Sequence, residues 1–502
     1  MSSTLDTSRG TRRAHLILLG FFVASLVAAL LVDNRWIFGS SVAEDGDFGA
    51  NSLLVTEAKH LSLVTGNYSK FHFNHPGPFY LYIQAIGEVV FHDALGIVAA
   101  PYQGQLLSII LLNAATYTLG LYLLFLAGGF RSLTPLLLGW SAFMATAHSV
   151  TPAPILGWAS LSSTWMPCMY VATFALLLTS AFAFARRVPW ATPVLVFSGG
   201  ALVHGHVSFA AIVPAVAIYA LYERIRDGSL SPKTWLPDRG ELLASAGVLA
   251  IFLAPILYHT VAHFPGEFGR YLSYKAPGIP ERGLLGAWRF TVRFLGGAEA
   301  FFGVIVALTA VTLRATWSKG DRISSWLRIL AAATVLAFLY AWRSVDSYQD
   351  DYTLQYLSVV PMLLLSTLVA RIADSLGVGI AWSRWVWLIP VALLIAPFGN
   401  PYRGSADVAA GVARLRQASQ AINGSGQMIG LRFEHGDWPY AMGLLAGAKR
   451  EGLAVCSTSP DWSFMATIAM TCQRAPDYDG MIGPARPDQA REISGLPPET
   501  RN

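Results

Sequence analysis

Charged residues are scarce in this sequence. Asp, Glu, Lys and Arg make up 13% of the 502 residues, whereas hydrophobic residues make up 54%. A soluble globular domain carries roughly 25% charged residues, so the whole chain is not an ordinary soluble protein. Residues 1–400 consist of apolar runs separated by short charged loops, whereas residues 401–502 have the composition of a soluble domain. We therefore predict a membrane-spanning domain over 1–400 and a small soluble domain over 401–502.

Cysteine is also rare, with only Cys168, Cys456 and Cys472 present. Three cysteines build neither a disulfide framework nor an all-cysteine metal site. Cys168 stands in an apolar run and is expected in the core. Cys456 and Cys472 both stand in the soluble region, where one disulfide is expected if that region faces an oxidising compartment.

Two signatures of nucleotide and nucleic-acid proteins are missing. The sequence has no P-loop and no Gly-rich dinucleotide fingerprint. The net charge is +5, but the basic residues recur in short loops between apolar runs rather than in one patch. This pattern is typical of membrane orientation and argues against a nucleic-acid partner.

Long apolar runs are what the sequence has in abundance. A membrane-spanning helix needs about 20 mostly apolar residues, and we count about eleven such segments. The first follows three arginines and is followed by Asp33-Asn34-Arg35-Trp36, which offers no small-residue cleavage site, so we interpret it as an uncleaved anchor. The expected spans are 15–32, 102–127, 133–149, 164–185, 191–203, 207–223, 240–259, 288–313, 324–342, 353–370 and 384–398.

Lys and Arg occupy alternate loops between these spans. With the N-terminus in the cytoplasm, the cytoplasmic loops are those at Arg131, Arg186-Arg187, 224–239, 314–328 and 371–384. All five are short and basic, as the positive-inside rule requires. The soluble C-terminal region then lies on the outer side, together with the segments 33–101, 150–163, 260–287 and 343–352.

Short elements are expected between and after the spans. Within the outer segment 33–101, residues 47–64 have a helical period and residues 79–91 are apolar but too short for a confident span. We expect both to form amphipathic helices at the membrane surface. The soluble region has strand-like runs at 428–433 and 453–456 on either side of a helical stretch at 438–450, which predicts a small α/β domain.

An acidic cluster stands near the start of the outer segment 33–101. Glu44, Asp45 and Asp47 place three carboxylates within four residues. One of them could take a proton from an acceptor hydroxyl as a general base. Asp45 and Asp47 could instead hold a divalent cation, Mg²⁺ or Mn²⁺, through oxygen ligands. A solvated acidic turn without function is the third interpretation.

A second polar cluster follows in the same outer segment. Pro76 and Pro78 flank Gly77, so the backbone after the cluster is stiff and turns tightly. Such a turn can fix basic side chains at the membrane interface, where they meet a lipid phosphate, while the aromatic residues anchor in the headgroup layer. The phosphate candidates are Lys70 and His75, and the substrate candidates are His72, Tyr80 and Tyr82.

Together the two clusters resemble the GT-C superfamily of lipid-phosphate-sugar-dependent glycosyltransferases, above all the aminoarabinose transferase and protein mannosyltransferase group. Those enzymes carry an acidic pair at the start of the first outer loop and a Lys-Pro-Pro-Leu-Tyr-Tyr-Trp-like segment further along. Here Asp45 and His75 stand thirty positions apart, and His75-Pro76-Gly77-Pro78-Phe79-Tyr80-Leu81-Tyr82 falls where that segment lies. The resemblance covers mainly residues 1–100. It implies Asp45 as catalytic base, with Asp47 as its alternative and His75 in place of the phosphate-contacting lysine.

Two other outer segments hold candidate binding residues. Arg270 and Lys275 stand among tyrosines, a pattern that suits a phosphate headgroup and equally suits an exposed, hydrated loop. Asp350 and Asp351 could bind sugar hydroxyls at the mouth between two spans, or pair with Arg343 and cap helices.

One aromatic residue of the soluble region is a candidate for acceptor binding. Trp438 follows the expected strand at 428–433, and an aromatic ring in that place can stack on a sugar face. The alternative is structural, because Asp437 can cap the helix that begins at Trp438.

These observations favour a glycosyltransferase. We expect it to move a hexose or a pentose from a polyprenyl-phosphate donor to a glycan, lipid or protein acceptor, on the outer face of a bacterial cytoplasmic (inner) membrane, with inversion at the anomeric carbon. The resemblance requires no metal ion, so a divalent cation at Asp45 and Asp47 stays an open possibility. The alternative is a transporter or flippase, which would place ionisable residues within the spans rather than in the outer loops.

Overall fold

Helices dominate the part of the chain that the computed structural model describes. That part comprises residues 9–146, 161–226, 236–275, 278, 283–296, 322–350, 352–377, 385–396, 398–399, 402–422, 427–467, 470–482 and 493–496. The chain divides into two compact units. We call residues 1–34, 110–254 and 275–400 the helical unit, and residues 35–109, 255–274 and 401–502 the mixed unit.

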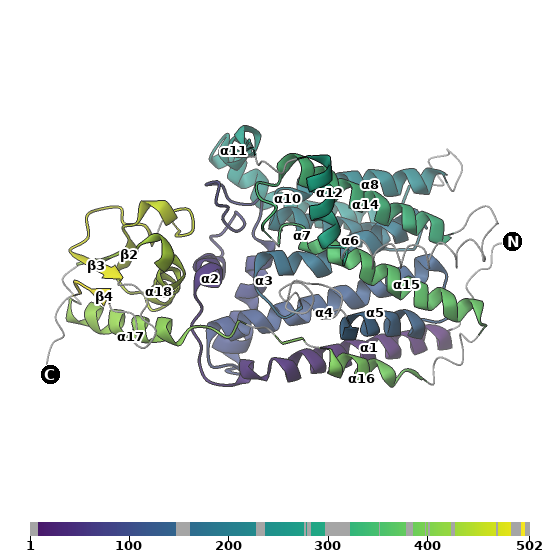
Figure 1. Cartoon of the computed structure of the whole chain (residues 1–502), viewed down its shortest axis with the longest axis horizontal. Coiled ribbons are helices and arrows are strands. Elements are labelled where there is room, and N and C mark those ends of the chain that lie inside the picture. The colour runs from purple at the N-terminus through teal and green to yellow at the C-terminus, as the bar shows by residue number, and fades with distance from the viewer. Residues whose placement is uncertain are drawn as a thin grey trace. The chain divides into compact units, whose positions relative to one another are not determined.

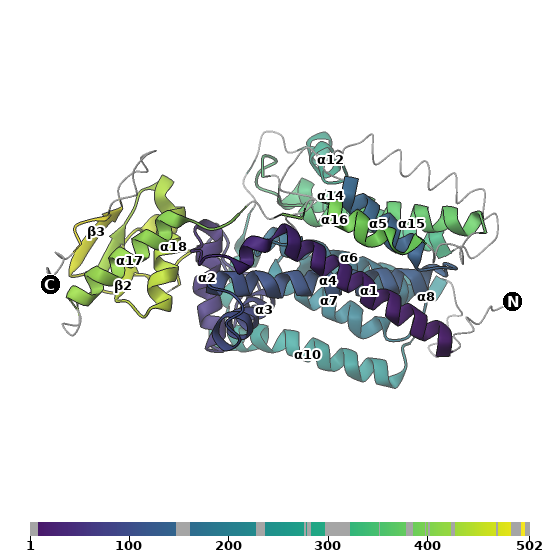
Figure 2. The same ribbon diagram turned by 90° about the horizontal axis from the view of Figure 1, so that it is seen from below.

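Helices of the helical unit lie roughly along one common direction, as α1, α4, α6, α8 and α15 show in Figures 1 and 2. The first residues of α4 and the last residues of α10 belong to the mixed unit. The elements are α1 (Arg9–Asp33), α4 (Pro101–Gly128), α5 (Thr134–Thr146), α6 (Met166–Ala185), α7 (Ala191–Gly205), α8 (Phe209–Arg226), α10 (Arg239–Ala262), α12 (Leu284–Arg293), α14 (Arg322–Ser344), η5 (Gln355–Ser358), α15 (Val359–Ser375) and α16 (Leu388–Ile395).

Burial differs sharply among these helices. The apolar stretch of α6 is 100% buried, and α6 packs against α7 and α8. A helix that is apolar all round belongs in such a central position. In α10 only 17% of the apolar stretch is buried, and Leu243 and Ile251 are 63% and 72% exposed. Water would penalise this exposed apolar surface, whereas lipid would not.

Six helices in the described part of the chain are long and apolar enough to cross a membrane. They are Arg13–Asp33, Pro101–Gly128, Met166–Ala185, Arg239–Ala262, Arg322–Ser344 and Gln355–Ser375. The two expected spans at 191–203 and 207–223 are separate helices, since α7 ends at Gly205 and α8 begins at Phe209. Most of the expected span 288–313 lies outside the described residues, as do the end of span 133–149 and the start of span 384–398.

The mixed unit joins residues 35–109 to the C-terminal region. The expected helices at 47–64 and 79–91 are present as α2 and as α3 followed by a π-helical turn, η2. The elements are η1 (Arg35–Phe38), α2 (Gly46–Lys59), α3 (Phe79–Gly87), η2 (Glu88–Ala94), α11 (Gly266–Ser273), α17 (Ala406–Ala421), β1 (Ile429–Arg432), η7 (His435–Asp437), α18 (Trp438–Arg450), β2 (Val455–Ser457), η8 (Pro460–Trp462), β3 (Tyr478–Ile482) and β4 (Ile493–Ser494).

A four-stranded sheet of order β2-β1-β3-β4 organises the C-terminal part of the mixed unit. β1 pairs in parallel with β2 and β3, and β3 pairs antiparallel with β4. Parallel neighbours need a crossover connection, and α18 makes the one between β1 and β2. α17 and α18 lie beside the sheet (Figure 2). The predicted α/β region is therefore confirmed.

One hydrophobic core connects α2 to this C-terminal region. Ala50 and Leu53 of α2 are fully buried in the same cluster as Leu444 of α18 and Leu431 of β1. The approach of α2 to α18 depends on glycine, because a Cβ added at Gly49 would come within 2.9 Å of the Gly443 nitrogen. Small residues allow helix backbones to pack this closely.

The expected disulfide between Cys456 and Cys472 is present in the mixed unit. Cys168, the third cysteine, is buried in the helical unit as predicted. The disulfide closes the chain around residues 457–471, which we call the disulfide loop.

Candidate functional site

The acidic segment Glu44–Asp47 leads into α2. Gly46, the first residue of α2, has φ +53, a left-handed conformation that favours glycine. The Asp45 carbonyl accepts the first helical hydrogen bond, from the Gly49 N–H at 3.0 Å. The two aspartates therefore occupy the very start of a helix, where unpaired N–H groups and the helix dipole favour negative charge.

Tyrosines from distant parts of the chain contact both aspartates. The Asp45 N–H donates to the Tyr402 hydroxyl at 2.6 Å, and the Tyr68 hydroxyl donates to Asp47 Oδ1 at 2.5 Å. Burial, together with Tyr102 and the Asp45 carboxylate, raises the pKa of Tyr402. The Tyr402 phenol thus stays protonated at neutral pH and does not repel the carboxylates beside it.

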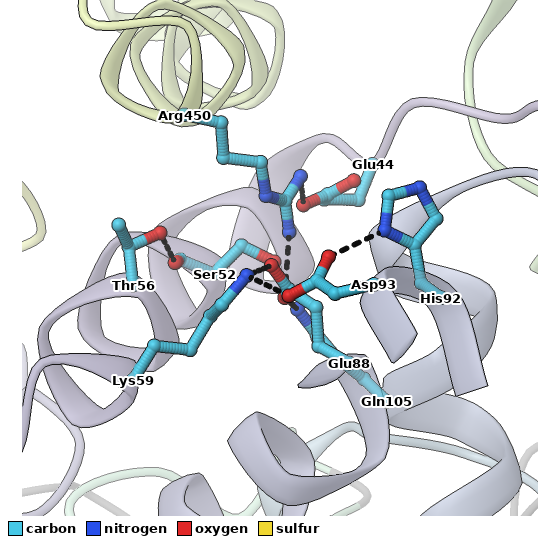
Figure 3. Close-up of polar contacts among 9 residues, drawn as sticks. All are labelled: Glu44, Ser52, Thr56, Lys59, Glu88, His92, Asp93, Gln105 and Arg450. Carbon is cyan, nitrogen blue, oxygen red and sulfur yellow. Dashed lines mark hydrogen bonds and ion pairs between the residues drawn. The ribbon is translucent and has the colours of Figure 1, made fainter. Parts of the chain in front are cut away.

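Glu44 is held by an arginine from the end of α18. Its carboxylate is 2% exposed, and Arg450 Nη1 lies 2.5 Å from Glu44 Oε1. Arg450 Nη2 also lies 3.6 Å from Glu88 Oε2. Burial lowers the pKa of Arg450, but Glu44 and Glu88 outweigh burial and raise it, so the guanidinium stays charged. Figure 3 shows Arg450 between the two carboxylates.

Lys59 provides the second cation of this cluster. Its Nζ lies 2.8 Å from Glu88 Oε1 and 2.8 Å from Asp93 Oδ2 (Figure 3). Burial disfavours the charge on Lys59, but hydrogen bonds with Asp93 and Glu88 raise its pKa above the ordinary value. Burial alone would raise the pKa of Glu88. Arg450, Lys59 and Gln105 lower it by a larger amount, so the pKa of Glu88 lies below its ordinary value. We call Glu44, Lys59, Glu88, Asp93 and Arg450 the buried charge cluster, in which Glu44 and Glu88 are buried and Asp93 is the exposed member at the edge.

The second predicted polar cluster forms a hairpin. The His75 N–H donates to the Asn67 carbonyl and the Gly66 N–H to the His75 carbonyl, both at 2.8 Å. His75 is 5% exposed at the base of this hairpin, whereas Lys70 is exposed near its tip. His72, with φ +59, makes the turn between the two strands of the hairpin.

Helix α11 is joined to the hairpin by hydrogen bonds. The Asn74 N–H donates to Glu267 Oε2 at 3.0 Å, and the Tyr271 hydroxyl donates to the Asn74 carbonyl. Arg270 Nη1 donates to the His72 carbonyl at 2.9 Å and lies 3.2 Å from Glu267 Oε1. The Arg270 side chain is still 59% exposed, so the rest of its guanidinium faces solvent.

The remaining predicted site residues fall in different places. Tyr80 is buried in α3, and the Tyr82 hydroxyl donates to the Leu63 carbonyl at 2.9 Å. Trp438 begins α18, and its ring lies over Gly46, because a Cβ added there would be 3.6 Å from Trp438.

Three of the predicted site residues stand outside the mixed unit. Lys275 is exposed in the helical unit. The Asp350 carbonyl, also in the helical unit, accepts a hydrogen bond from the Thr353 N–H. Asp351 lies outside the described residues.

The acidic segment does not resemble a metal site. Within the described residues, no group of three or more His, Cys, Asp or Glu side chains is placed to hold a metal ion. The Asp47 carboxylate accepts a hydrogen bond from Tyr68, and Glu44 is paired with Arg450, whereas the contact of Asp45 with Tyr402 is through the Asp45 backbone N–H. The described part of the chain therefore provides two aspartates, and no third such side chain, for a divalent cation at this segment.

Solved structures of ArnT match this chain over nearly its whole length. ArnT from Cupriavidus metallidurans bound to undecaprenyl phosphate aligns at TM-score 0.53 and 14% identity, covering 92% of each chain. The apo state of ArnT from the same organism aligns at TM-score 0.52 and 12% identity, covering 95% of this chain and 94% of ArnT. ArnT is a GT-C aminoarabinose transferase. This chain has the GT-C fold. No family model and no curated protein matches the sequence.

The GT-C fold confirms two of the predictions made from the sequence. The resemblance drawn from the acidic cluster and the His75-Pro76-Gly77-Pro78 segment is correct at the level of fold. So is the prediction of a helical, multi-pass membrane protein with a small C-terminal α/β region.

Sequence reasoning missed the partners of the acidic segment. Arg450 looks like an ordinary basic residue at a helix C-terminus, where cations are common, and Tyr402 stands in a polar stretch without a motif. Glu88 did carry a signal: it is an acidic residue in the apolar run 79–91. A carboxylate among apolar residues requires a buried partner, although the sequence does not say which one.

Proposed function

We propose that this GT-C chain transfers a sugar from a polyprenyl-phosphate donor to an acceptor hydroxyl. The observation that carries the proposal is the match to ArnT over 92% of both chains, in a structure of ArnT bound to undecaprenyl phosphate. The acidic segment adds support, because it begins α2 with two aspartates in fixed backbone positions.

The proposed reaction is one displacement at the anomeric carbon. The acceptor hydroxyl oxygen forms a bond to this carbon while the bond from the carbon to the phosphate oxygen breaks. Polyprenyl phosphate leaves with the bonding electrons, and the hydroxyl proton passes to Asp45 or Asp47 as general base. A single displacement inverts the configuration of the anomeric carbon.

The leaving phosphate can contact only a cation whose side chain is exposed. Arg450 and Lys59 are paired with buried carboxylates, and His75 is 5% exposed. Lys70 is exposed near the hairpin tip, and Arg270 stands beside the same hairpin with a side chain 59% exposed. We therefore favour Lys70 and Arg270 for the phosphate.

We propose the outer face of the cytoplasmic membrane as the place of reaction. Basic loops alternate along the sequence in the way that keeps the N-terminus inside. The disulfide between Cys456 and Cys472 adds support, because structural disulfides persist in oxidising compartments.

The test uses the full chain in nanodiscs with synthetic polyprenyl-phosphate pentose and hexose donors and an envelope extract as acceptor source. We expect Asp45→Asn or Asp47→Asn to lower transfer of labelled sugar about 100- to 10,000-fold, the usual contribution of a general base. Asp407→Asn, at an exposed carboxylate in the first turn of α17, is the matched control and should transfer normally. Full transfer by both test variants would show the catalytic assignment to be wrong. Substrate counterflow in proteoliposomes without a covalent product would identify a transporter instead.

A further inference from the structure

Three aromatic side chains form a row at the disulfide loop. The Trp438 and Trp462 rings are stacked, with centroids 5.0 Å apart and planes 19° apart. The Trp462 and Phe464 centroids are 5.7 Å apart. All three side chains are partly exposed and rest on the core of the C-terminal region. We call Trp438, Trp462 and Phe464 the aromatic row.

Covalent and polar contacts hold the disulfide loop in place. The disulfide joins its two ends, and the Cys472 N–H donates to the Ser457 carbonyl at 3.0 Å. Near its C-terminal end, Lys449 Nζ donates to Thr467 Oγ1 at 3.2 Å and to Glu57 Oε1 of α2 at 2.8 Å. A surface fixed in this way loses little conformational entropy when a ligand binds.

The aromatic row lies next to the acidic segment. The Tyr68 ring, whose hydroxyl donates to Asp47, is 6.0 Å from the Phe464 ring. At the other end of the row, the Trp438 ring lies over Gly46, between the two aspartates in sequence. A ligand stacked on the aromatic row would therefore reach the carboxylates of Asp45 and Asp47.

Polar groups flank the aromatic row. Glu434, His435 and Asp461 are exposed beside it in sequence, and the His435 ring is 5.0 Å from Trp462. A sugar ring matches this combination, because its C–H face packs on aromatic rings while its hydroxyls bond carboxylates and imidazole.

We propose that the aromatic row binds a sugar ring of the acceptor, so that the acceptor is a glycan. The row presents a hydroxyl of that glycan to the acidic segment. An acyl chain would favour an aliphatic surface without flanking carboxylates, so a glycan suits these side chains better than a lipid tail. This assignment rests on the proposed function, which supplies the need for an acceptor beside Asp45 and Asp47.

The experiment measures binding of four linear tetrasaccharides, a glucan, a mannan, a galactan and an arabinan, to the full chain in nanodiscs by saturation-transfer NMR. We expect at least one to bind the unchanged protein and Trp462→Ala to weaken that binding about tenfold, which corresponds to about 1.4 kcal/mol, because the stacking surface is lost. Trp462→Phe keeps a ring and should restore most of the affinity. Trp385→Ala removes an indole that is 48% exposed in the helical unit and serves as the matched control.

The outcomes separate this inference from the proposed function. Binding of none of the four tetrasaccharides, or equal binding by Trp462→Ala and the unchanged protein, overturns the glycan assignment even if Asp45→Asn abolishes sugar transfer. The reverse result is also informative: a tetrasaccharide binds in a Trp462-dependent way, but the protein transfers no sugar from any polyprenyl-phosphate donor. That result supports the sugar-binding site and overturns the proposed function. An unchanged melting temperature and an intact disulfide in Trp462→Ala show that the variant is folded.

Discussion

The two units satisfy their buried polar groups in different ways. In the helical unit many hydroxyls bond a carbonyl of their own helix, as Thr179 does with Ala175 at 2.9 Å and Thr367 with Leu363 at 2.7 Å. In the mixed unit, Glu44 depends on Arg450, which comes from the other end of the sequence. Local pairs form as soon as a helix forms. Long-range pairs require the complete tertiary structure.

Buried charges show a second contrast, between a small ion pair and a larger network. The helical unit buries the Glu223 carboxylate, which Arg328 Nη2 contacts at 2.8 Å and Ser325 Oγ at 2.9 Å. The buried charge cluster instead draws three carboxylates and two cations from α2, η2, α18 and the segment before α2. Its members form a network, so the loss of one member affects several others.

The largest expected effect is at Arg450. Arg450→Met leaves Glu44 and Glu88 buried with less compensation, and breaking a buried ion pair in this way costs about 3–5 kcal/mol. We expect a lower melting temperature of the purified full chain, measured by intrinsic fluorescence, and loss of sugar transfer. Arg450→Lys keeps the charge and should restore part of both. Unchanged stability of Arg450→Met would show that the mixed unit does not depend on its long-range ion pairs more than the helical unit does on its local ones.

A smaller effect on the melting temperature is expected when the pH is lowered. Because the pKa of Glu88 lies below its ordinary value of 4.5, ionised Glu88 stabilises the fold above pH 4.5, and this contribution is lost as pH falls through the lowered value. Asp93 behaves in the same way relative to 3.8. The melting temperature should therefore fall from pH 4.5 downward. Glu88→Gln should lower it at pH 7 and make the acid-side fall shallower, whereas an equally steep fall would exclude Glu88 as its source.

The smallest effect is expected in the helical unit. Thr179→Val removes a hydroxyl that bonds only carbonyls of its own helix, at Ala175 and Leu176, and replaces it with a methyl group of similar size. Such hydrogen bonds in a membrane environment contribute about 0.6 kcal/mol. We expect a melting temperature within a degree or two of the unchanged protein, and a large loss would show that this local pair matters as much as a long-range one.

The same contrast explains how far the sequence predicts the structure. Apolar runs locate helices because about 20 apolar residues are enough to indicate a span, and the alternating pattern around 428–456 locates β1, α18 and β2 for a similar local reason. The acidic segment also stands out locally. Its partners Arg450, Tyr402 and Tyr68 do not, because no spacing rule connects residues that meet only through tertiary packing. The close approach of Gly49 to Gly443 is likewise a tertiary contact that no local sequence pattern predicts.

The distance in sequence between Glu44 and Arg450 also sets the order in which the ribosome synthesises the two partners. About 400 residues lie between them, and a ribosome adding about 5–20 residues per second needs roughly 20–80 seconds to cover that distance. During this interval the acidic segment has been synthesised, but the arginine that neutralises it has not. The candidate active centre is thus completed only after α18 has been synthesised, so a translation product truncated before α18 would lack it.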